Sequence, residues 1–266
     1  MLFRSRSTGL PLLNLQPAEE LPSPLVEARR ELLSKMDDAH RAARPGYGDL
    51  DARIAGFELA ARMQLSATDA LDLSGESEAT REMYGLNDEA TQSYGRRCLM
   101  ARRLVERGVR FVQVFIERQI WDNHSNLETD LRQCCAKTDR PAAALIRDLK
   151  ERGLLDSTLV IWGGEFGRMP VSQLRQGGAD GAGRDHGPGG FTTWMAGGGI
   201  EGGTIYGATD DIGYRAVENR VSVHDFHATM LHLLGLDFRA LSYERHSLPE
   251  RLTDQYPAKV IHGILA

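Results

Sequence analysis

Carboxylate and imidazole side chains gather in three short polar segments in the second half of this 266-residue chain. The segments are Trp121–Asn126, Gly163–Arg168 and Gly183–Pro188. Their side chains able to ligate a metal are Asp122, His124, Glu165, Asp185 and His186. Carboxylate oxygens and imidazole nitrogens together satisfy Zn²⁺, Mn²⁺ or Fe. Five ligands exceed the needs of one ion and suit two metals about 3.5–4 Å apart, which clamp the oxygens of an in-line displacement.

Each segment taken alone has a simpler interpretation. Asp122 and His124 can belong to an exposed loop in which the aspartate bonds its own backbone. Glu165 can cap a helix or pair with Arg168, and Asp185–His186 between glycines can be a turn. The metal interpretation therefore depends on the three segments converging on one place.

The segments adjoin three strands that the sequence predicts at residues 109–116, 157–163 and 191–196. The second is a continuous apolar run, which is typical of a strand buried on both faces. A helix that reaches about Arg152, kinked or divided by Pro141, separates the first two strands. This order predicts a mostly parallel sheet whose strand ends gather the first two polar segments on one edge. A long glycine-rich loop brings the third segment back over that edge.

The first half of the chain is predicted to be helical after an extended lead-in over residues 1–24. Apolar periodicity and capping signals predict helices within residues 25–107, and Gly108 ends the last of them. The chain thus divides into a lead-in with a helical segment, 1–108, and an α/β portion, 109–266. A basic cluster that we expect on the solvated face of a helix consists of Arg96, Arg97, Arg102 and Arg103.

Composition limits the classes of function. A net charge of −5 and a pI near 5.9 give no electrostatic reason to expect nucleic-acid binding. No run of 18 apolar residues predicts a membrane span, and the N-terminal residues lack the apolar stretch of a signal peptide. The three cysteines are odd in number and two are adjacent, which predicts free thiols at Cys98, Cys134 and Cys135.

A C-terminal helix is predicted with Ser222 as its N-cap, Asp225 at its third position and Gly235 as its stop. Its histidines lie among apolar residues, so we expect packing roles for His224, His227 and His232. No Gly-x-Ser-x-Gly elbow, Walker loop, dinucleotide fingerprint or zinc-finger spacing occurs in the chain.

Several ordered blocks resemble one family, the domain of unknown function numbered 1501, whose members are often labelled sulfatase-like. The blocks include TLVIWGGEFGR, GRDH, FTTWMAGGG, YGATDDIGY, VHDFHATMLHLLGLD and RLTD. The resemblance runs from about Phe3 to the C-terminus and implies the C-terminal portion of a family member. That family is in turn similar to the alkaline phosphatase superfamily. The similarity implies a three-layer α/β/α fold, incomplete at the N-terminus and preceded by the helical segment, with a two-metal site.

The superfamily comparison carries over to individual ligand positions. Asp122 and His124 match the Asp and His of one metal site, although the superfamily usually spaces them further apart. His186 resembles a later histidine ligand, and Asp185 is either a ligand or the group that orients it. Glu165 occupies the place of a metal-binding Asp-His pair.

Two departures from the superfamily pattern concern the chemistry. Phe166 stands where the histidine of that Asp-His pair would be. Phenylalanine cannot ligate a metal, so the site of the second metal would lack this ligand. The superfamily carries its first metal-binding Asp and its Ser, Thr or Cys nucleophile before the region matched here. We therefore expect this chain alone to lack the nucleophile and to hydrolyse aryl sulfates and aryl phosphates negligibly.

The resemblance implies a metal-dependent hydrolase domain acting on sulfate or phosphate esters, with Zn²⁺, Mn²⁺ or Ca²⁺ as its ion. Arg168 and Arg184 are candidates for binding a small-molecule or glycan ester. The alternative is a non-catalytic binding or structural module that retains a partial metal site. Full-length relatives are often exported, and the sequence specifies neither the substrate nor the oligomeric state.

Overall fold

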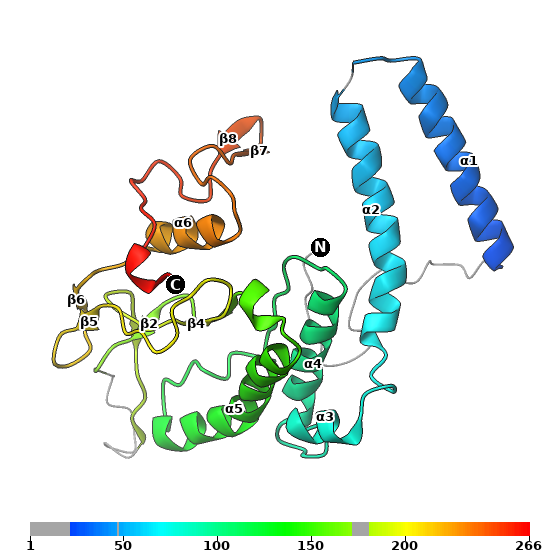
Figure 1. The fold of residues 1–266 in the computed structure, drawn as a ribbon. Helices are drawn as coiled ribbons and strands as arrows, with labels where there is room; N and C mark the ends of the chain where they lie inside the picture. Colours follow the sequence, from blue (N-terminus) through cyan, green and yellow to red (C-terminus); the bar gives the residue numbers. More distant parts are fainter. Residues whose placement is uncertain (1–21, 47, 172–180) are drawn as a thin grey trace. The chain divides into compact units, whose positions relative to one another are not determined.

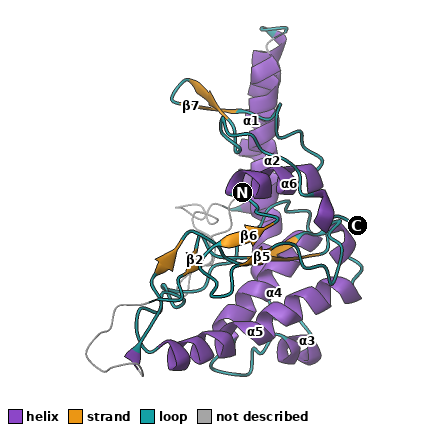
Figure 2. Ribbon diagram, turned by 90° about the vertical axis from the view of Figure 1, so that its left-hand side faces the viewer, coloured by secondary structure: helices purple, strands orange, loops and turns teal. Residues whose placement is uncertain are grey.

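The computed structural model describes residues 22–46, 48–171 and 181–266, and the chain forms two compact units, Met1–Glu117 and Arg118–Ala266. The boundary between the two units lies after residue 117, whereas the sequence predicts a boundary after residue 108. The described part is a mixed α/β structure of helices and small antiparallel sheets (Figures 1 and 2). No helix in these ranges has both the length and the apolarity needed to cross a membrane.

The first unit is helical, as predicted. Its helices are α1 (Ser23–Ala42), α2 (Gly48–Leu71), α3 (Glu78–Met83) and α4 (Gln92–Glu106) (Figure 1). A proline in the first turn starts α1, and Ser77 caps α3 by accepting the N–H of Thr80 at 3.1 Å. The α4 helix supplies much of the buried core, including Cys98, Leu99 and Leu104.

The basic cluster on α4 is solvated only at Arg96, which is exposed. The side chains of Arg97 and Arg102 are 3% and 2% exposed, which contradicts the sequence prediction. Their charges are neutralised by carboxylates brought from other segments of the same unit: Glu117 pairs with Arg97, and Glu76 pairs with Arg102. Sequence periodicity alone carries no information about these distant partners.

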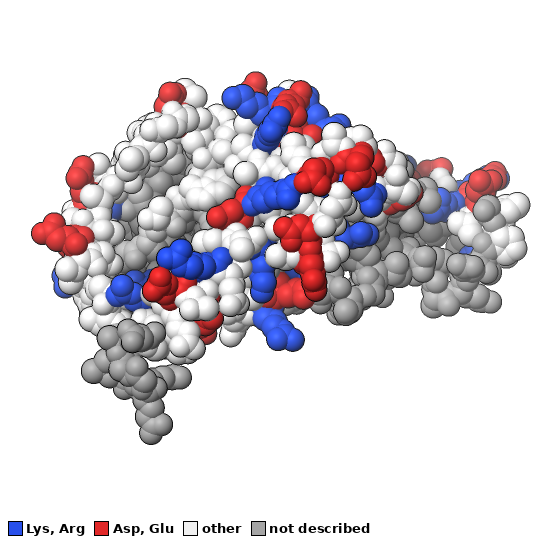
Figure 3. Space-filling model, turned by 90° about the horizontal axis from the view of Figure 1, so that it is seen from below, with Lys and Arg blue, Asp and Glu red and all other residues white. Residues whose placement is uncertain are grey.

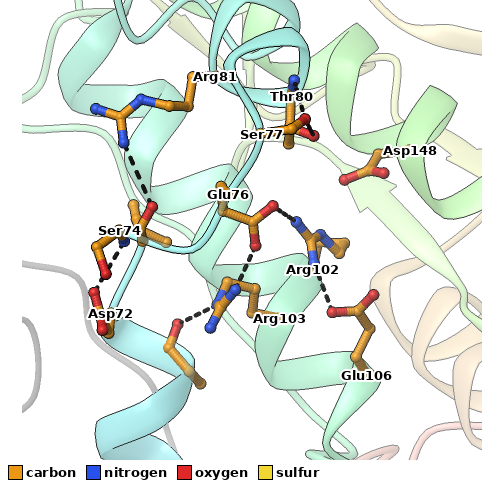
Figure 4. Close-up of polar contacts among 12 residues, drawn as sticks. Asp72, Ser74, Glu76, Ser77, Thr80, Arg81, Arg102, Arg103, Glu106 and Asp148 are labelled. Carbon is orange, nitrogen blue, oxygen red and sulfur yellow. Dashed lines mark hydrogen bonds and ion pairs between the residues drawn. The ribbon is translucent and has the colours of Figure 1, made fainter.

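Glu76 lies at the centre of this network, which Figure 4 shows in detail. Its two carboxylate oxygens pair with Arg102, at 2.6 Å, and with Arg103. Arg102 also bonds Glu106 at 2.6 Å, and Arg103 donates to the carbonyl of Ala70 at 3.0 Å. The network therefore ties the segment that follows α2 to the face of α4.

The predicted strand at residues 109–116 is absent, although these residues are described. Phe111 and Phe115 are 55% and 45% exposed. The carbonyl oxygen of Phe115 accepts a hydrogen bond from Arg97 at 2.7 Å, instead of joining a ladder. A β-branched, aromatic run becomes a strand only when a neighbour pairs with it, and no described segment does so here.

The second unit contains the long helix α5 (Leu127–Glu151), followed by the 3₁₀ turn η1 (Leu155–Ser157). Of the two predicted effects of Pro141, a kink or a division, the division does not occur, and α5 runs through this residue. Its ring is fully buried, so packing offsets the one backbone hydrogen bond that a proline removes. Oppositely charged pairs four residues apart lie along α5, such as Arg132–Glu128. Figure 3 likewise shows basic and acidic side chains interspersed on one face.

The strands of the second unit pair in antiparallel two-stranded sheets, so the predicted parallel sheet is wrong for the described residues. The pairs are β1 (Val160–Trp162) with β4 (Trp194–Ala196), β2 (Gly167–Arg168) with β3 (His186–Gly187), β5 (Ala208–Thr209) with β6 (Ala216–Glu218), and β7 (Tyr243–Arg245) with β8 (Leu248–Glu250). The strand predicted at 157–163 thus corresponds to β1, and that at 191–196 corresponds to β4. Ile161 in β1 is 38% exposed rather than buried on both faces, because the strand has a single neighbour.

The C-terminal helix α6 (Val223–Leu233) has the predicted signals. Ser222 and Asp225 form a reciprocal capping box, and Gly235, with φ +73°, follows its end. Asp225 also accepts the N–H of Lys259 at 2.9 Å, and Thr229 accepts that of Ile261 at 3.0 Å. These bonds hold the C-terminal segment, with its 3₁₀ turn η3 (His262–Ile264), against α6.

Candidate metal site

Three potential metal ligands meet at one point of the second unit. The Nε2 atoms of His186 and His124 lie 2.9 Å and 3.0 Å from Oδ1 of Asp122, and they lie 3.1 Å from each other. These three atoms form a nearly equilateral triangle. Asp122 and His124 are half-buried and His186 is exposed, so one side of the triangle is open to solvent.

Backbone hydrogen bonds bring the first ligand segment to the third. Arg184 N–H donates to the carbonyl of Asn123 at 2.9 Å, and the N–H groups of Asn126 and Leu127 donate to carbonyls in the Gly181–Ala182 segment at 3.1 Å. Gly183 makes this approach feasible, since a Cβ there would lie 2.0 Å from the carbonyl carbon of His124. The pairing explains how Asp122 and His186 meet across 64 positions of sequence.

The short β2–β3 pair adds the second polar segment. Arg168 is directly opposite His186 in the register, and Met169 N–H donates to the carbonyl of Asp185 at 2.8 Å. A Cβ on Gly167 would lie 2.4 Å from the carbonyl oxygen of Gly190, so this crossing also requires glycine. The glycine-rich segments thus let three stretches of backbone pack closely around the ligand atoms.

Neighbouring side chains fix the two imidazoles. Nδ1 of His124 is 3.4 Å from Oδ1 of Asp185, which turns its Nε2 toward Asp122. The Phe166 ring lies against His186, with ring centroids 4.3 Å apart. Asp185 therefore lies behind a ligand of the triangle, and Phe166 supports the other imidazole.

Arg168 is the main positive charge at the triangle. Its Nη2 lies 2.7 Å from Oδ1 of Asp122 and donates to the carbonyl of Trp121 at 3.1 Å. The hydrogen bonds from His186 and then Arg168 lower the pKa of Asp122 to about 2. Asp122 therefore carries a full negative charge at neutral pH, as a metal ligand must.

The remaining candidates lie outside the triangle. Glu165 is exposed and does not belong to the group of convergent ligand atoms found among the described residues. Arg184 takes part through its backbone, which donates to Asn123 and accepts from Arg168 at 3.4 Å. The Arg168–Asp122 pair could not be predicted from the sequence, because no local spacing relates residues so far apart.

The triangle has the dimensions of one face of a tetrahedral site. Ligands 2.0–2.1 Å from a zinc ion are about 3.3 Å apart along each edge of a tetrahedron. The observed edges of 2.9, 3.0 and 3.1 Å are slightly shorter. Two imidazole nitrogens and one carboxylate oxygen also match the three-ligand sets of catalytic zinc sites, which keep a fourth position open. The donor set fits one divalent ion.

A family model described as "Protein of unknown function (DUF1501)" matches residues 2–265. The match covers essentially the whole chain, not only a C-terminal portion. No curated protein and no solved structure gives a significant match to the chain.

Proposed function

Because this chain belongs to the DUF1501 family and brings two histidines and an aspartate into one triangle, we propose that it binds a divalent metal ion at Asp122, His124 and His186. The ion serves a hydrolase-type site for sulfate or phosphate esters, of the kind found in the alkaline phosphatase superfamily. The observation that carries this proposal is the convergence of the three ligand atoms within 4.8 Å of one another. Zn²⁺ and Mn²⁺ suit this donor set better than Ca²⁺, which prefers an all-oxygen shell.

The surrounding residues support an anionic substrate. A bound ion would supply Lewis acidity to an ester oxygen. Arg168 lies beside the triangle and carries a guanidinium able to hold a sulfate or phosphate oxygen. In this proposal Arg168 exchanges its bond to Asp122 for the ester group, while its bond to the Trp121 carbonyl keeps it in place.

A second candidate function is a non-catalytic binding or structural module. One specific observation favours it: the same Oδ1 atom of Asp122 contacts both histidines and Arg168. These polar side chains therefore already have partners without an ion, and their contacts can serve to hold the loops together. In addition, among the described residues no serine, threonine or cysteine side chain forms a hydrogen bond with the triangle, and an activated nucleophile requires a base within reach.

Metal binding to the purified chain tests the primary proposal. After removal of metal with a chelator, we expect Zn²⁺ or Co²⁺ to bind at one equivalent, with a Co²⁺ absorption spectrum typical of tetrahedral nitrogen and oxygen ligands. Asp122→Ala combined with His186→Ala should abolish this binding. The matched control is Asp211→Ala with His232→Ala, which removes an exposed carboxylate and an exposed imidazole elsewhere in the same unit. Equal metal binding by both double variants would refute the site.

Assays with aryl sulfates and aryl phosphates separate the two candidates. Turnover that requires the added ion and is lost in the Asp122→Ala, His186→Ala variant would assign catalysis. Stoichiometric metal binding without turnover would assign the non-catalytic module. Fluorescence and circular dichroism of each variant establish that it remains folded.

A further inference from the structure

An open pocket of about 330 Å³ lies beside the β5–β6 hairpin. Its lining residues are Gly189, Tyr214, Arg215, Ala216 and Arg220. The volume lies at the lower end of the range for small-ligand sites. Two of the five lining residues are arginines and none is acidic, so the pocket has a positive character.

The two arginines keep their charges available. None of the ion pairs formed by the described residues includes Arg215 or Arg220. The Arg215 guanidinium lies 5.7 Å from the ring centroid of Tyr214, and this stacking leaves its N–H groups free to donate. The nearby Asp210 carboxylate accepts the N–H of Tyr214 at 2.7 Å through Oδ1, and among the described residues it forms no ion pair with either arginine. Unpaired guanidinium groups around a hollow favour an oxyanion such as phosphate or sulfate.

The glycine backbone that lines this pocket follows closely in sequence the strand that carries His186. The carbonyl of Gly189 accepts the N–H of Ala216 at 2.8 Å, and a Cβ on Gly189 would lie 2.6 Å from the carbonyl oxygen of Tyr214. Gly189 follows His186 by three residues, so their Cα atoms are at most about 11 Å apart. The β2 strand and the β5–β6 hairpin lie side by side in both views (Figures 1 and 2).

We propose that the pocket formed by Arg215, Arg220 and Tyr214 binds a second anionic group, phosphate or sulfate, of the ligand whose first anionic group reaches the metal triangle. This inference rests on the proposed function for the identity of the first group. It narrows the substrate class to molecules with two oxyanionic groups, such as multiply sulfated or phosphorylated sugars. A simple aryl ester would occupy the triangle alone.

Titration of the ¹⁵N-labelled full chain with inorganic phosphate and with inorganic sulfate, in the absence of added metal, tests the pocket. We expect saturable shifts of the Gly189, Tyr214 and Ala216 amides, and comparison of the two anions identifies the preferred one. Arg215→Gln with Arg220→Gln should raise the Kd at least about tenfold, the loss expected for charge-assisted hydrogen bonds. Arg239→Gln is the matched control, because Arg239 stacks on Phe238 at 4.8 Å outside the pocket. Unchanged binding in the double variant, or an equal loss in the control, would overturn the proposal.

A bisphosphate ester of a short alkanediol tests the link between the two sites. With Zn²⁺ present, it should bind the wild-type chain at least about tenfold more tightly than inorganic phosphate, because the second group binds intramolecularly. Either the two arginine substitutions or Asp122→Ala with His186→Ala should remove this advantage. A bisphosphate that binds no more tightly than phosphate overturns the link. If no ion binds the triangle but phosphate binding still requires Arg215 and Arg220, the proposed function fails and the anion pocket remains.

Discussion

At the scale of single residues, Asp122 determines the character of the candidate site. Three nitrogen atoms lie within 3.0 Å of one of its carboxylate oxygens: Nε2 of His124, Nε2 of His186 and Nη2 of Arg168. A carboxylate in these surroundings stays ionised in acid, and the two imidazole nitrogens are its proposed partners around a metal. When an ion binds, each Nε2 must be free of its proton and directed at the ion instead of at Asp122, and Arg168 has to change partner as well.

The first prediction concerns this carboxylate. Arg168→Gln removes one hydrogen bond and the nearest positive charge, so the pKa of Asp122 should rise from about 2 toward its ordinary value of 3.8. The ¹³C chemical shift of the Asp122 carboxyl carbon, followed against pH, measures this change. Arg168→Lys retains the charge and should produce a smaller rise. A pKa that stays near 2 in Arg168→Gln would show that Arg168 contributes nothing to it.

The second prediction concerns Gly183. An added methyl group there would lie 2.0 Å from the carbonyl carbon of His124, so Gly183→Ala must push the two ligand segments apart. We expect a loss of about 2 kcal/mol of stability and metal affinity reduced at least about tenfold, measured by denaturant unfolding and by Co²⁺ titration.

Gly181→Ala is the matched control for this substitution. Its Cβ would meet nothing closer than Oδ1 of Asn126 at 3.9 Å, and the substitution lies two residues from Gly183 in the same segment. It should leave both stability and metal affinity close to those of the wild-type chain. Equal effects of the two substitutions would mean that close backbone approach at Gly183 does not shape the site.

At the scale of elements, the position of α4 depends on buried charge as well as on apolar packing. Glu76 is 6% exposed and Arg102 is 2% exposed, so neither charge tolerates the loss of its partner. Desolvation acts to raise the pKa of Glu76, but the hydrogen bonds from Arg103 and Arg102 outweigh it, and the pKa lies below its ordinary 4.5. The folded state therefore favours the ionised form.

The third prediction follows from this linkage. A depressed pKa stabilises the folded state above pH 4.5, and the contribution is lost as pH falls through the lower folded-state pKa. Glu76→Gln should thus destabilise α4 by about 3 kcal/mol at pH 7, with a smaller difference from wild type at pH 3. Hydrogen exchange of the α4 amides measures this loss of stability at each pH. Glu128→Gln is the control, because its pair with Arg132 is exposed on both sides and should cost little.

The elements also show where sequence reasoning succeeds. The capping box of Ser222 and Asp225 lies within four residues, so the beginning of α6 could be predicted from local chemistry. The strand predicted at 109–116 needs a neighbouring strand, which its own sequence does not supply. In the structure the Arg97 side chain donates a hydrogen bond to a carbonyl of that segment instead. The order of elements predicts a parallel sheet, but β1 and β4 pair antiparallel. Pairing direction is a long-range property that apolar runs do not encode.

At the scale of the whole molecule, the residues proposed to bind the metal lie within the unit Arg118–Ala266, while the family match extends over both units. The sequence predicts that five ligands converge at one sheet edge. The structure brings Asp122, His124 and His186 together without such a sheet, through backbone pairing of the ligand loops. The polar segments were thus informative about the location of the cluster, but the edge geometry used to connect them was wrong.

The last prediction concerns how an ion redistributes stability over the molecule. An ion that binds only the assembled triangle stabilises it by about 2.7 kcal/mol when its free concentration is 100 times its Kd. Any opening that separates the ligand loops must therefore become rarer. The amide of Arg184 reports such openings, because its bond to the Asn123 carbonyl is broken in them. The β7–β8 hairpin carries none of the proposed ligands, so its amides provide an internal reference.

Native-state hydrogen exchange with and without Zn²⁺ measures the effect. We expect exchange at Arg184 to slow by about two orders of magnitude at that Zn²⁺ concentration, while exchange in the β7–β8 hairpin stays unchanged. Asp122→Ala with His186→Ala should remove the protection at Arg184. Uniform slowing across the second unit would instead indicate an ion that acts on global unfolding, and the absence of any slowing would contradict binding at the triangle. Because this readout does not depend on turnover, it tests the metal site equally well for a hydrolase and for a non-catalytic module.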